Sequence, residues 1–271
     1  MTAQLTYKTL LFIGFNLIFN ISYASDTARE KRWADEIVDS IVVGDAEWLK
    51  AGKQKFLSVY TEHNTEKAKG AVILAHGTGV HPNWSDVIYP LRTQLPDFGW
   101  QTLSIQLPIL AKEAKYIDYA PLYDEVAPRF KAAVAFLKKK GIQNIVIAAH
   151  SQGTTMSAYY MSKNPKHNIK AFVAIGMRGA FNKDKRMDGL NSLKNISIPI
   201  FDIYGEQDLE AVLESQQAKT NTAKKAGNKN YTQLQVPGAN HFFVGKESVL
   251  VKRVRGWLAK NAAGTELKMN E

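Results

Sequence analysis

The stretch from residue 144 to residue 155, NIVIAAHSQGTT, constrains the fold more than any other part of this chain. An apolar run that begins with β-branched residues leads into Ser151, which has the small residues Ala149 and Gly153 two positions on either side. A helix-compatible segment follows at residues 154–163. This order predicts a buried strand, a sharp turn and a helix, with the serine at the apex. The small neighbours allow the strand and the helix to approach each other closely.

The composition limits which functions such a serine could serve. The absence of cysteine excludes disulfides, thiolate metal sites, a cysteine nucleophile and a lipid-anchored N-terminal cysteine. The hydrophobic content of 45% suffices for one sizeable core. The net charge of +10 favours anionic surfaces such as lipid headgroups or acidic glycans, although a solvated basic surface is the plainer interpretation. The lysines are scattered and no basic motif interleaved with aromatic residues occurs, so no nucleic acid partner is expected.

Residues 1–24 have the pattern of a secretory signal peptide. Lys8 is the only charge before Asp26, and the segment from residue 10 to residue 21 is apolar apart from two asparagines. Ser22 and Ala24 are small residues at positions −3 and −1 of a cleavage point after Ala24. The apolar run is shorter than the roughly 20 residues of a membrane span. We therefore expect a periplasmic or secreted protein, with an uncleaved N-terminal anchor as the alternative.

The remaining chain is expected to form one body with an N-terminal attachment. Residues 25–66 are predicted to form a helix and a hairpin packed on the body, residues 67–262 the core, and residues 263–271 a flexible tail. The helix spans residues 27–43 in this prediction and lies against the body or, alternatively, on a membrane surface. The hairpin is predicted from strands at residues 47–50 and 55–60. Continuous apolar runs predict buried strands at residues 70–75 and 171–175. Further strands are predicted at residues 100–106, 198–204 and 231–236. Helical periodicity predicts helices at residues 85–95 and 122–137.

Three further segments suit a serine nucleophile. The glycine-rich run HGTG, residues 76–79, follows a buried strand, Asp208 follows a late strand, and His241 follows the last strand. With the Ala149-x-Ser151-x-Gly153 turn, this pattern resembles the α/β-hydrolase superfamily, in which nucleophile, acid and histidine occur in this chain order. Ala149 stands where the common pattern has glycine. More narrowly, HGTGxHPxW together with AHSQG resembles an exported bacterial family labelled only as a domain of unknown function.

The resemblance implies an α/β-hydrolase fold, with a mostly parallel central sheet, helices on both faces and a small cap at about residues 177–195. It implies that Ser151 is the nucleophile, that His241 moves its proton, and that Asp208 orients the imidazole. By the same resemblance, the backbone N–H groups of Thr78 and Gln152 form the oxyanion hole.

Several residues near these segments have alternative interpretations. Glu206 is the fallback for the acid, whereas Asp202 lies inside a strand and is expected to face the core or a neighbouring helix. His76 is expected to hydrogen-bond within its turn. His81 and Trp84 either contact substrate at the rim of the site or form a structural lid over the loop.

Together these features predict an exported serine hydrolase of the esterase, thioesterase or amidase type, acting on a small-molecule or lipid-like acyl substrate. No cofactor or metal is expected, because no dinucleotide loop, phosphate loop or metal-ligand spacing occurs. One alternative is a non-catalytic envelope binding protein on a hydrolase scaffold, which would hold an anionic envelope partner. The other is an acyltransferase that uses an alcohol or a sugar in place of water.

Overall fold

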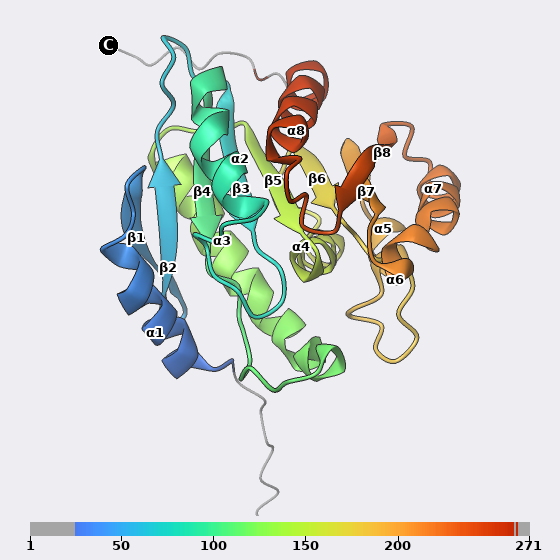
Figure 1. The fold of residues 1–271 in the computed structure, drawn as a ribbon, viewed down its shortest axis with the longest axis horizontal. Helices are drawn as coiled ribbons and strands as arrows, with labels where there is room; N and C mark the ends of the chain where they lie inside the picture. Colours follow the sequence, from blue (N-terminus) through green and yellow to red (C-terminus); the bar gives the residue numbers. More distant parts are fainter. Residues whose placement is uncertain (1–24, 263, 265–271) are drawn as a thin grey trace, which may run out of the picture.

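One mixed sheet of eight strands forms the centre of the molecule, in the order β1-β2-β4-β3-β5-β6-β7-β8 (Figure 1). The computed structural model describes residues 25–262 and residue 264. The predicted signal peptide and all but one residue of the predicted tail therefore lie outside the described residues. β2 pairs antiparallel with both β1 and β4, and every later pairing in the sheet is parallel.

The strands and helices alternate along the chain after the initial hairpin. The strands are β1 Asp45–Ala51, β2 Gln54–Thr61, β3 Gly70–Ala75, β4 Trp100–Ile105, β5 Ile145–His150, β6 Ala171–Ile175, β7 Ile200–Gln207 and β8 Tyr231–Asn240. The α-helices are α1 Thr27–Val38, α2 Ile88–Gln94, α3 Tyr123–Lys139, α4 Gln152–Lys163, α5 Gly189–Leu193, α6 Glu210–Leu213, α7 Gln216–Lys225 and α8 Glu247–Asn261. Two 3₁₀ helices, η1 Leu95–Phe98 and η2 Tyr116–Leu122, complete the described elements.

Helices cover both faces of the sheet, and the side chains of each strand alternate between the two layers. In β3, Ile73 packs with the buried residues of α3 and α4, whereas Val72 and Leu74 pack with those of α2 and α8. Both layers are buried, which explains the continuous apolar runs in the sequence. The prediction of a mostly parallel sheet with helices on both faces is confirmed. Within residues 25–262, no helix combines the length and the apolar character that crossing a membrane requires.

Some predicted boundaries are wrong for local reasons. The first helix ends at Val38 rather than at residue 43, because the Ser40 hydroxyl and N–H both bond to the Ile37 carbonyl and close the last turn. The helix predicted from residue 85 begins only at Ile88. The last strand continues through Pro237 to Asn240, which is tolerated because β8 is an edge strand.

Helix α7 was not predicted, because it has no apolar stripe. Its buried residues are Lys219 and Ala223. The Lys219 ammonium lies 2.7 Å from an Asp202 carboxylate oxygen and also donates to the Met177 carbonyl oxygen, at 2.7 Å. The Tyr231 hydroxyl donates to Asp202 at 2.5 Å. Asp202 therefore faces a neighbouring helix, as predicted, and a buried ion pair holds α7 in place.

Replacing Lys219 by methionine is expected to lower the free energy of unfolding by about 3–5 kcal/mol, because Asp202 would stay buried without its counter-charge. Urea unfolding measures this change. Lys224→Met, an exposed change on the same helix, is the control and should stay within about 0.5 kcal/mol of the wild type. A cost below about 1 kcal/mol for Lys219→Met would show that the pair does not hold the helix.

Candidate active site

The segments that carry the candidate residues meet at one edge of the sheet. β3, β5, β7 and β8 run parallel to one another, so their carboxyl ends lie on the same side. Residues 76–79 follow β3, Ser151 follows β5, Asp208 follows β7 and His241 follows β8. Residues that are far apart in the sequence are thereby brought to one edge of the sheet.

Ser151 occupies the sharp turn predicted between β5 and α4. Its backbone has φ 53° and ψ −124°, a conformation that is rare and strained for a residue with a side chain. A Cβ atom on Gly153 would lie 2.6 Å from the Ala75 carbonyl oxygen, so only glycine fits where α4 meets the end of β3. Ala149 pairs across the sheet with Ala75 and Ala174, and these small neighbours leave room for its methyl group.

The structure brings Ser151, His241 and Asp208 into hydrogen-bond contact. His241 Nε2 lies 2.9 Å from the Ser151 hydroxyl oxygen, and His241 Nδ1 lies 2.5 Å from an Asp208 carboxylate oxygen. With Nδ1 donating to the carboxylate, Nε2 is the acceptor for the serine proton. This arrangement can withdraw the Ser151 proton and return it to a departing group.

Asp208 is well placed to stay ionised. Burial raises the pKa of its carboxyl group, but the His241 hydrogen bond and charge and the N–H groups of Gly205 and Leu209 outweigh burial and hold that pKa below its ordinary value. The fallback Glu206 is exposed and accepts a hydrogen bond from the Gly238 N–H at 2.8 Å instead. Of the two candidates, Asp208 is therefore the carboxylate in contact with the imidazole.

Two residues that support His241 were missed by the sequence analysis. A Cβ atom on Gly176 would lie 2.9 Å from His241 Cε1, so glycine is required beside the imidazole. The only sequence signal for this role was the position of Gly176 directly after a buried strand. His150 Nε2 donates to the His241 carbonyl oxygen at 2.9 Å, and burial lowers the pKa of His150 to about 3, so this imidazole is neutral.

The glycine-rich loop is held so that the N–H of one peptide faces away from His76. The His76 side chain donates from Nδ1 to the Gly77 carbonyl oxygen at 2.8 Å, because its Nε2 accepts the Leu107 N–H at 2.9 Å. The Gly77 carbonyl and the Thr78 N–H belong to one trans peptide and point in opposite directions. His76 thus bonds within its turn, as expected, and leaves the Thr78 N–H on the other side.

Two backbone N–H groups are available for an anion. Neither the Thr78 nor the Gln152 N–H has an acceptor within the part of the chain that the structure describes. Gln152 is the first residue of α4, where the helix dipole favours negative charge. A Cβ atom on Gly77 would lie 3.2 Å from Ser151 Cβ, so this loop passes directly beside the serine.

Helix α1 contacts the same glycine-rich loop through a hydrogen bond and through aromatic packing. The Arg29 guanidinium donates to the Gly79 carbonyl oxygen at 2.9 Å and also to the Leu110 carbonyl oxygen. The centroids of the Trp33 and His81 rings are 4.3 Å apart, and those of the His81 and Trp84 rings are 5.4 Å apart. His81 is therefore packed behind the rim, and burial lowers its pKa to about 4. The sequence offered no signal that α1 would contact a loop 50 residues away.

A cavity of about 200 Å³ opens over Ser151. Its mouth is apolar: the Leu209 side chain is 53% exposed and the Phe242 side chain is 44% exposed. The cavity is lined by Gly77, Thr78, Val80, Trp84, His150, Ser151, Leu209, His241 and Phe242. Of the two predicted rim residues, Trp84 lines this space and His81 does not. Within residues 25–262 and residue 264, no group of three or more His, Asp or Glu side chains is arranged to hold a metal ion.

One family profile matches most of the chain. This family is described as "Protein of unknown function (DUF3530)", and the match covers residues 27–121 and 118–260. The predicted resemblance to a family of unknown function is thereby confirmed. No curated protein matches the chain.

Solved structures show the α/β-hydrolase fold predicted from the sequence. Est1E from Butyrivibrio proteoclasticus has 17% identity and a TM-score of 0.60, covering 80% of this chain and 98% of its own. Dienelactone hydrolase from Anabaena variabilis has 18% identity and a TM-score of 0.59, covering 81% and 98%. XC6422 from Xanthomonas campestris, described as an α/β serine hydrolase without a lid, has 14% identity and a TM-score of 0.60, covering 83% and 98%.

Arg29→Met should slow the reaction of Ser151 with a fluorophosphonate about tenfold. A hydrogen bond to a charged group contributes about 1.5–3 kcal/mol, and a barrier change of about 1.4 kcal/mol is tenfold in rate. Labelling rates followed by intact mass measure the effect. Arg32→Met, an exposed change on the same helix, should label like the wild type. Equal rates for both variants would show that the Gly79 contact does not position the loop.

A second expectation concerns acid stability. His76 and His150 are buried, and burial lowers the pKa of each to about 3, below the ordinary 6.5. As pH falls from 6.5, both imidazoles are therefore protonated in the unfolded chain while they stay neutral in the folded chain. Each histidine therefore lowers the free energy of unfolding by about 1.4 kcal/mol per pH unit on the way down. His150→Gln should reduce this slope by that amount between pH 6 and pH 4, measured by urea unfolding at several pH values. Parallel pH curves for variant and wild type would contradict this.

Proposed function

We propose that this chain, which belongs to the family described as "Protein of unknown function (DUF3530)", is an exported serine hydrolase that cleaves an ester, thioester or amide. The observation that carries the proposal is the continuous contact from Ser151 through His241 to Asp208, with distances of 2.9 Å and 2.5 Å. The adjoining N–H groups of Thr78 and Gln152 would bind the oxygen of a substrate carbonyl, and the open cavity would admit that carbonyl to Ser151.

The proposed reaction has two halves. Ser151 Oγ attacks the acyl carbon while His241 Nε2 takes the hydroxyl proton, and the carbonyl oxygen becomes an anion held by the Thr78 and Gln152 N–H groups. The anion collapses, the leaving group departs with the proton from His241, and an acyl-serine remains. Water then adds with His241 as base, which releases the acid and restores Ser151. One such N–H donor typically lowers the barrier by about 3–4 kcal/mol.

The shape of the cavity supports a small or partly bound acyl group. Its volume of about 200 Å³ is below the roughly 300–1,000 Å³ of pockets that enclose drug-sized ligands. The apolar mouth at Leu209 and Phe242 favours a hydrocarbon-bearing acyl chain that extends out of the cavity. We propose a small-molecule or lipid-like acyl substrate on this basis.

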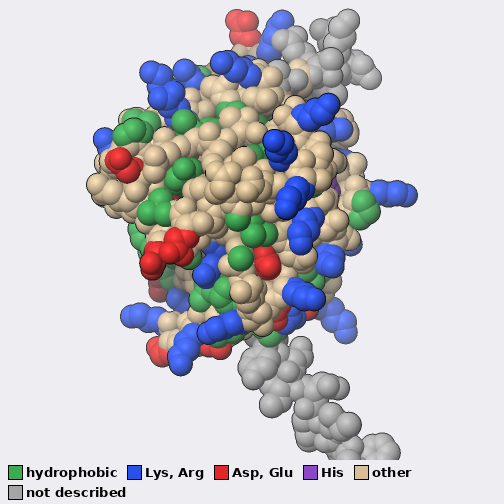
Figure 2. All heavy atoms as spheres, turned by 90° about the vertical axis from the view of Figure 1, so that its right-hand side faces the viewer, with side chains coloured by type: hydrophobic (Ala, Val, Ile, Leu, Met, Phe, Trp, Pro, Cys, Tyr) green, Lys and Arg blue, Asp and Glu red, His purple; other side chains and the backbone are tan. Residues whose placement is uncertain are grey.

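Export and surface charge complete the proposal. The pattern of residues 1–24 supports a signal peptide cleaved after Ala24 and a periplasmic or secreted location. Figure 2 shows lysine and arginine side chains over much of one face of the molecule, with acidic side chains fewer. A groove of about 530 Å³ along α8 is basic, being lined in part by Lys252, Arg253, Arg255 and Lys260. Peripheral contact with anionic envelope surfaces would use such charges.

Labelling with a fluorophosphonate, read by intact mass, tests the proposed chemistry. The wild type should gain a single adduct, and Ser151→Ala and His241→Ala should gain none. Ser248→Ala, an exposed serine on α8, is the control and should label like the wild type. A folded wild type that gains no adduct would overturn the proposal. Product analysis with simple esters then distinguishes the free acid of a hydrolase from the new ester of an acyltransferase.

A further inference from the structure

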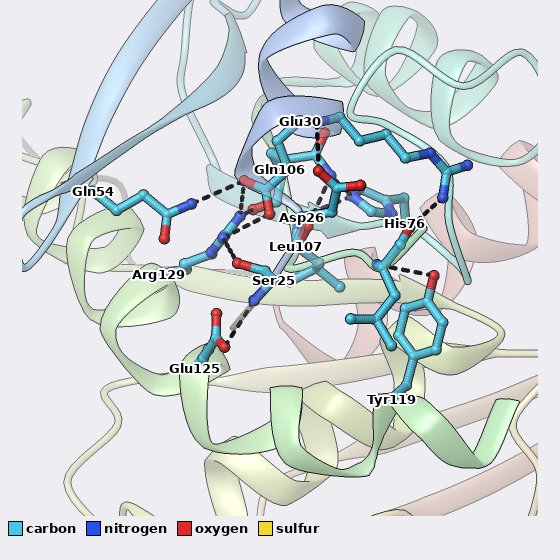
Figure 3. A network of polar contacts seen from close by, with 12 residues as sticks. Ser25, Asp26, Glu30, Gln54, His76, Gln106, Leu107, Tyr119, Glu125 and Arg129 are labelled. Carbon is cyan, nitrogen blue, oxygen red and sulfur yellow. Dashed lines mark hydrogen bonds and ion pairs between the residues drawn. The ribbon is translucent and has the colours of Figure 1, made fainter. Parts of the chain in front are cut away.

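The backbone at Ser25 is fixed inside a polar network between α1, α3 and the segment after β4. Figure 3 shows the Ser25 N–H directed at Glu125, and the two atoms lie 3.1 Å apart. The Asp26 N–H donates to the Ile109 carbonyl oxygen at 2.7 Å. Ser25 as a whole is only 6% exposed. The nitrogen atom of Ser25 is therefore held in place rather than free in solvent.

Carboxylates outnumber cations in this network. Arg129 makes two hydrogen bonds of 2.9 Å to the buried Glu30 carboxylate, which also accepts from Gln54. Glu125 is a second carboxylate beside this pair; burial, and to a smaller extent the Glu125 charge, raise the pKa of Glu30.

The remaining charges of the network nearly cancel. Asp26 caps α1 by accepting the backbone N–H of Arg29 at 2.8 Å, and the Arg29 guanidinium adds one positive charge in the same turn. His76 is neutral because burial lowers its pKa to about 3. The carboxylates of Asp26, Glu30 and Glu125 thus outnumber the guanidinium groups of Arg29 and Arg129 by one. One positive charge at the nitrogen of Ser25 would balance the set.

We propose that Glu125 and the Glu30–Arg129 pair form a receptor for the α-ammonium group of Ser25, created when the Ala24–Ser25 peptide bond is hydrolysed. Water adds across that amide, leaving a carboxylate on Ala24 and an ammonium on Ser25, and a signal peptidase is the catalyst. Two independent observations meet at one bond: the small residues Ser22 and Ala24 point to cleavage there, and the structure holds the next nitrogen against a carboxylate. This inference rests on the proposed export and not on the proposed hydrolysis.

The receptor would act on the site through α1. The helix begins at Thr27, and its Arg29 donates to the Gly79 carbonyl oxygen of the glycine-rich loop. An ion pair at Ser25 would anchor the start of α1 only four residues before that contact. Processing of the N-terminus would thereby strengthen the support of the loop beside Ser151.

Four proteins test the receptor: the chain beginning at Ser25, the same chain with one added N-terminal glycine, and both with Glu125→Gln. The glycine turns the Ser25 nitrogen back into an amide and moves the ammonium one residue away, without altering any side chain. At pH 7 the added glycine should lower the melting temperature by about 4 °C, since about 1–2 kcal/mol corresponds to such a shift in a chain of this size. In the Glu125→Gln background it should have almost no effect, because the ion pair is already lost.

The pH dependence of the melting-temperature difference shows whether the α-amino group of Ser25 is responsible for it. An α-amino group has an ordinary pKa of about 7.7–8.0, and pairing with Glu125 raises it in the folded state. The advantage of the Ser25 chain is then complete below that ordinary value and disappears as pH rises through the folded value. The charged or titratable groups of the surrounding network are the same in both chains: Asp26, Arg29, Glu30, His76, Tyr119, Glu125 and Arg129. A melting-temperature difference that persists at pH 10 would overturn the proposal.

The exported protein completes the test. Intact mass of the chain recovered after expression with its own residues 1–24 should show a start at Ser25. A start elsewhere, equal melting temperatures at pH 7, or additive effects of the glycine and Glu125→Gln would each overturn the receptor. Fluorophosphonate labelling of the Ser25 chain is read separately, so a failure of the hydrolase proposal is distinguishable from a failure of the receptor.

Discussion

The close packing of α4 against the end of β3 is the constraint on which the rest of the site depends. A Cβ at Gly153 would overlap the carbonyl oxygens of Ala75 and His76, so the helix can start there only with glycine. This contact leaves Ser151 in its strained conformation at the apex and brings Gly77 beside it. Asp208 and His241 need then only reach the same edge, which the parallel order of β7 and β8 ensures.

Features that depend on local sequence could be predicted. The strands at residues 70–75 and 171–175 have the predicted bounds, because a strand buried on both faces must be continuously apolar. The meeting of Ser151, Asp208 and His241 was implied by the resemblance of their chain order, each after a strand, to the α/β-hydrolase superfamily. The positions of α1 and α7 could not be predicted, because residues far along the chain determine them. α7 is placed by Asp202 in β7, and the placement of α1 depends on Gly79 and Arg129, which lie far along the chain.

Buried charges decide where the polar helices dock. The Glu30–Arg129 pair fixes α1 against α3, and the Asp202–Lys219 pair fixes α7 against the sheet. Such pairs add less net stability than their close contact suggests, because both ions lose their water. A displaced helix, however, would strand a charge in an apolar interior. Helix α7 has no apolar stripe to direct its packing. The cost of leaving a buried charge unpaired therefore fixes its docking position, as hydrophobic periodicity does for helices that have such a stripe.

The packing of Trp33, His81 and Trp84 has an optical consequence. Two of the five tryptophans of the chain lie at the glycine-rich loop, one on α1 and the other on the cavity wall. The indole ring centroids of this pair are 6.1 Å apart, and both rings contact the His81 imidazole, so their surroundings would change if α1 and the loop separated. Intrinsic fluorescence therefore gives a built-in readout of how closely α1 and the loop are engaged, with no label attached to either.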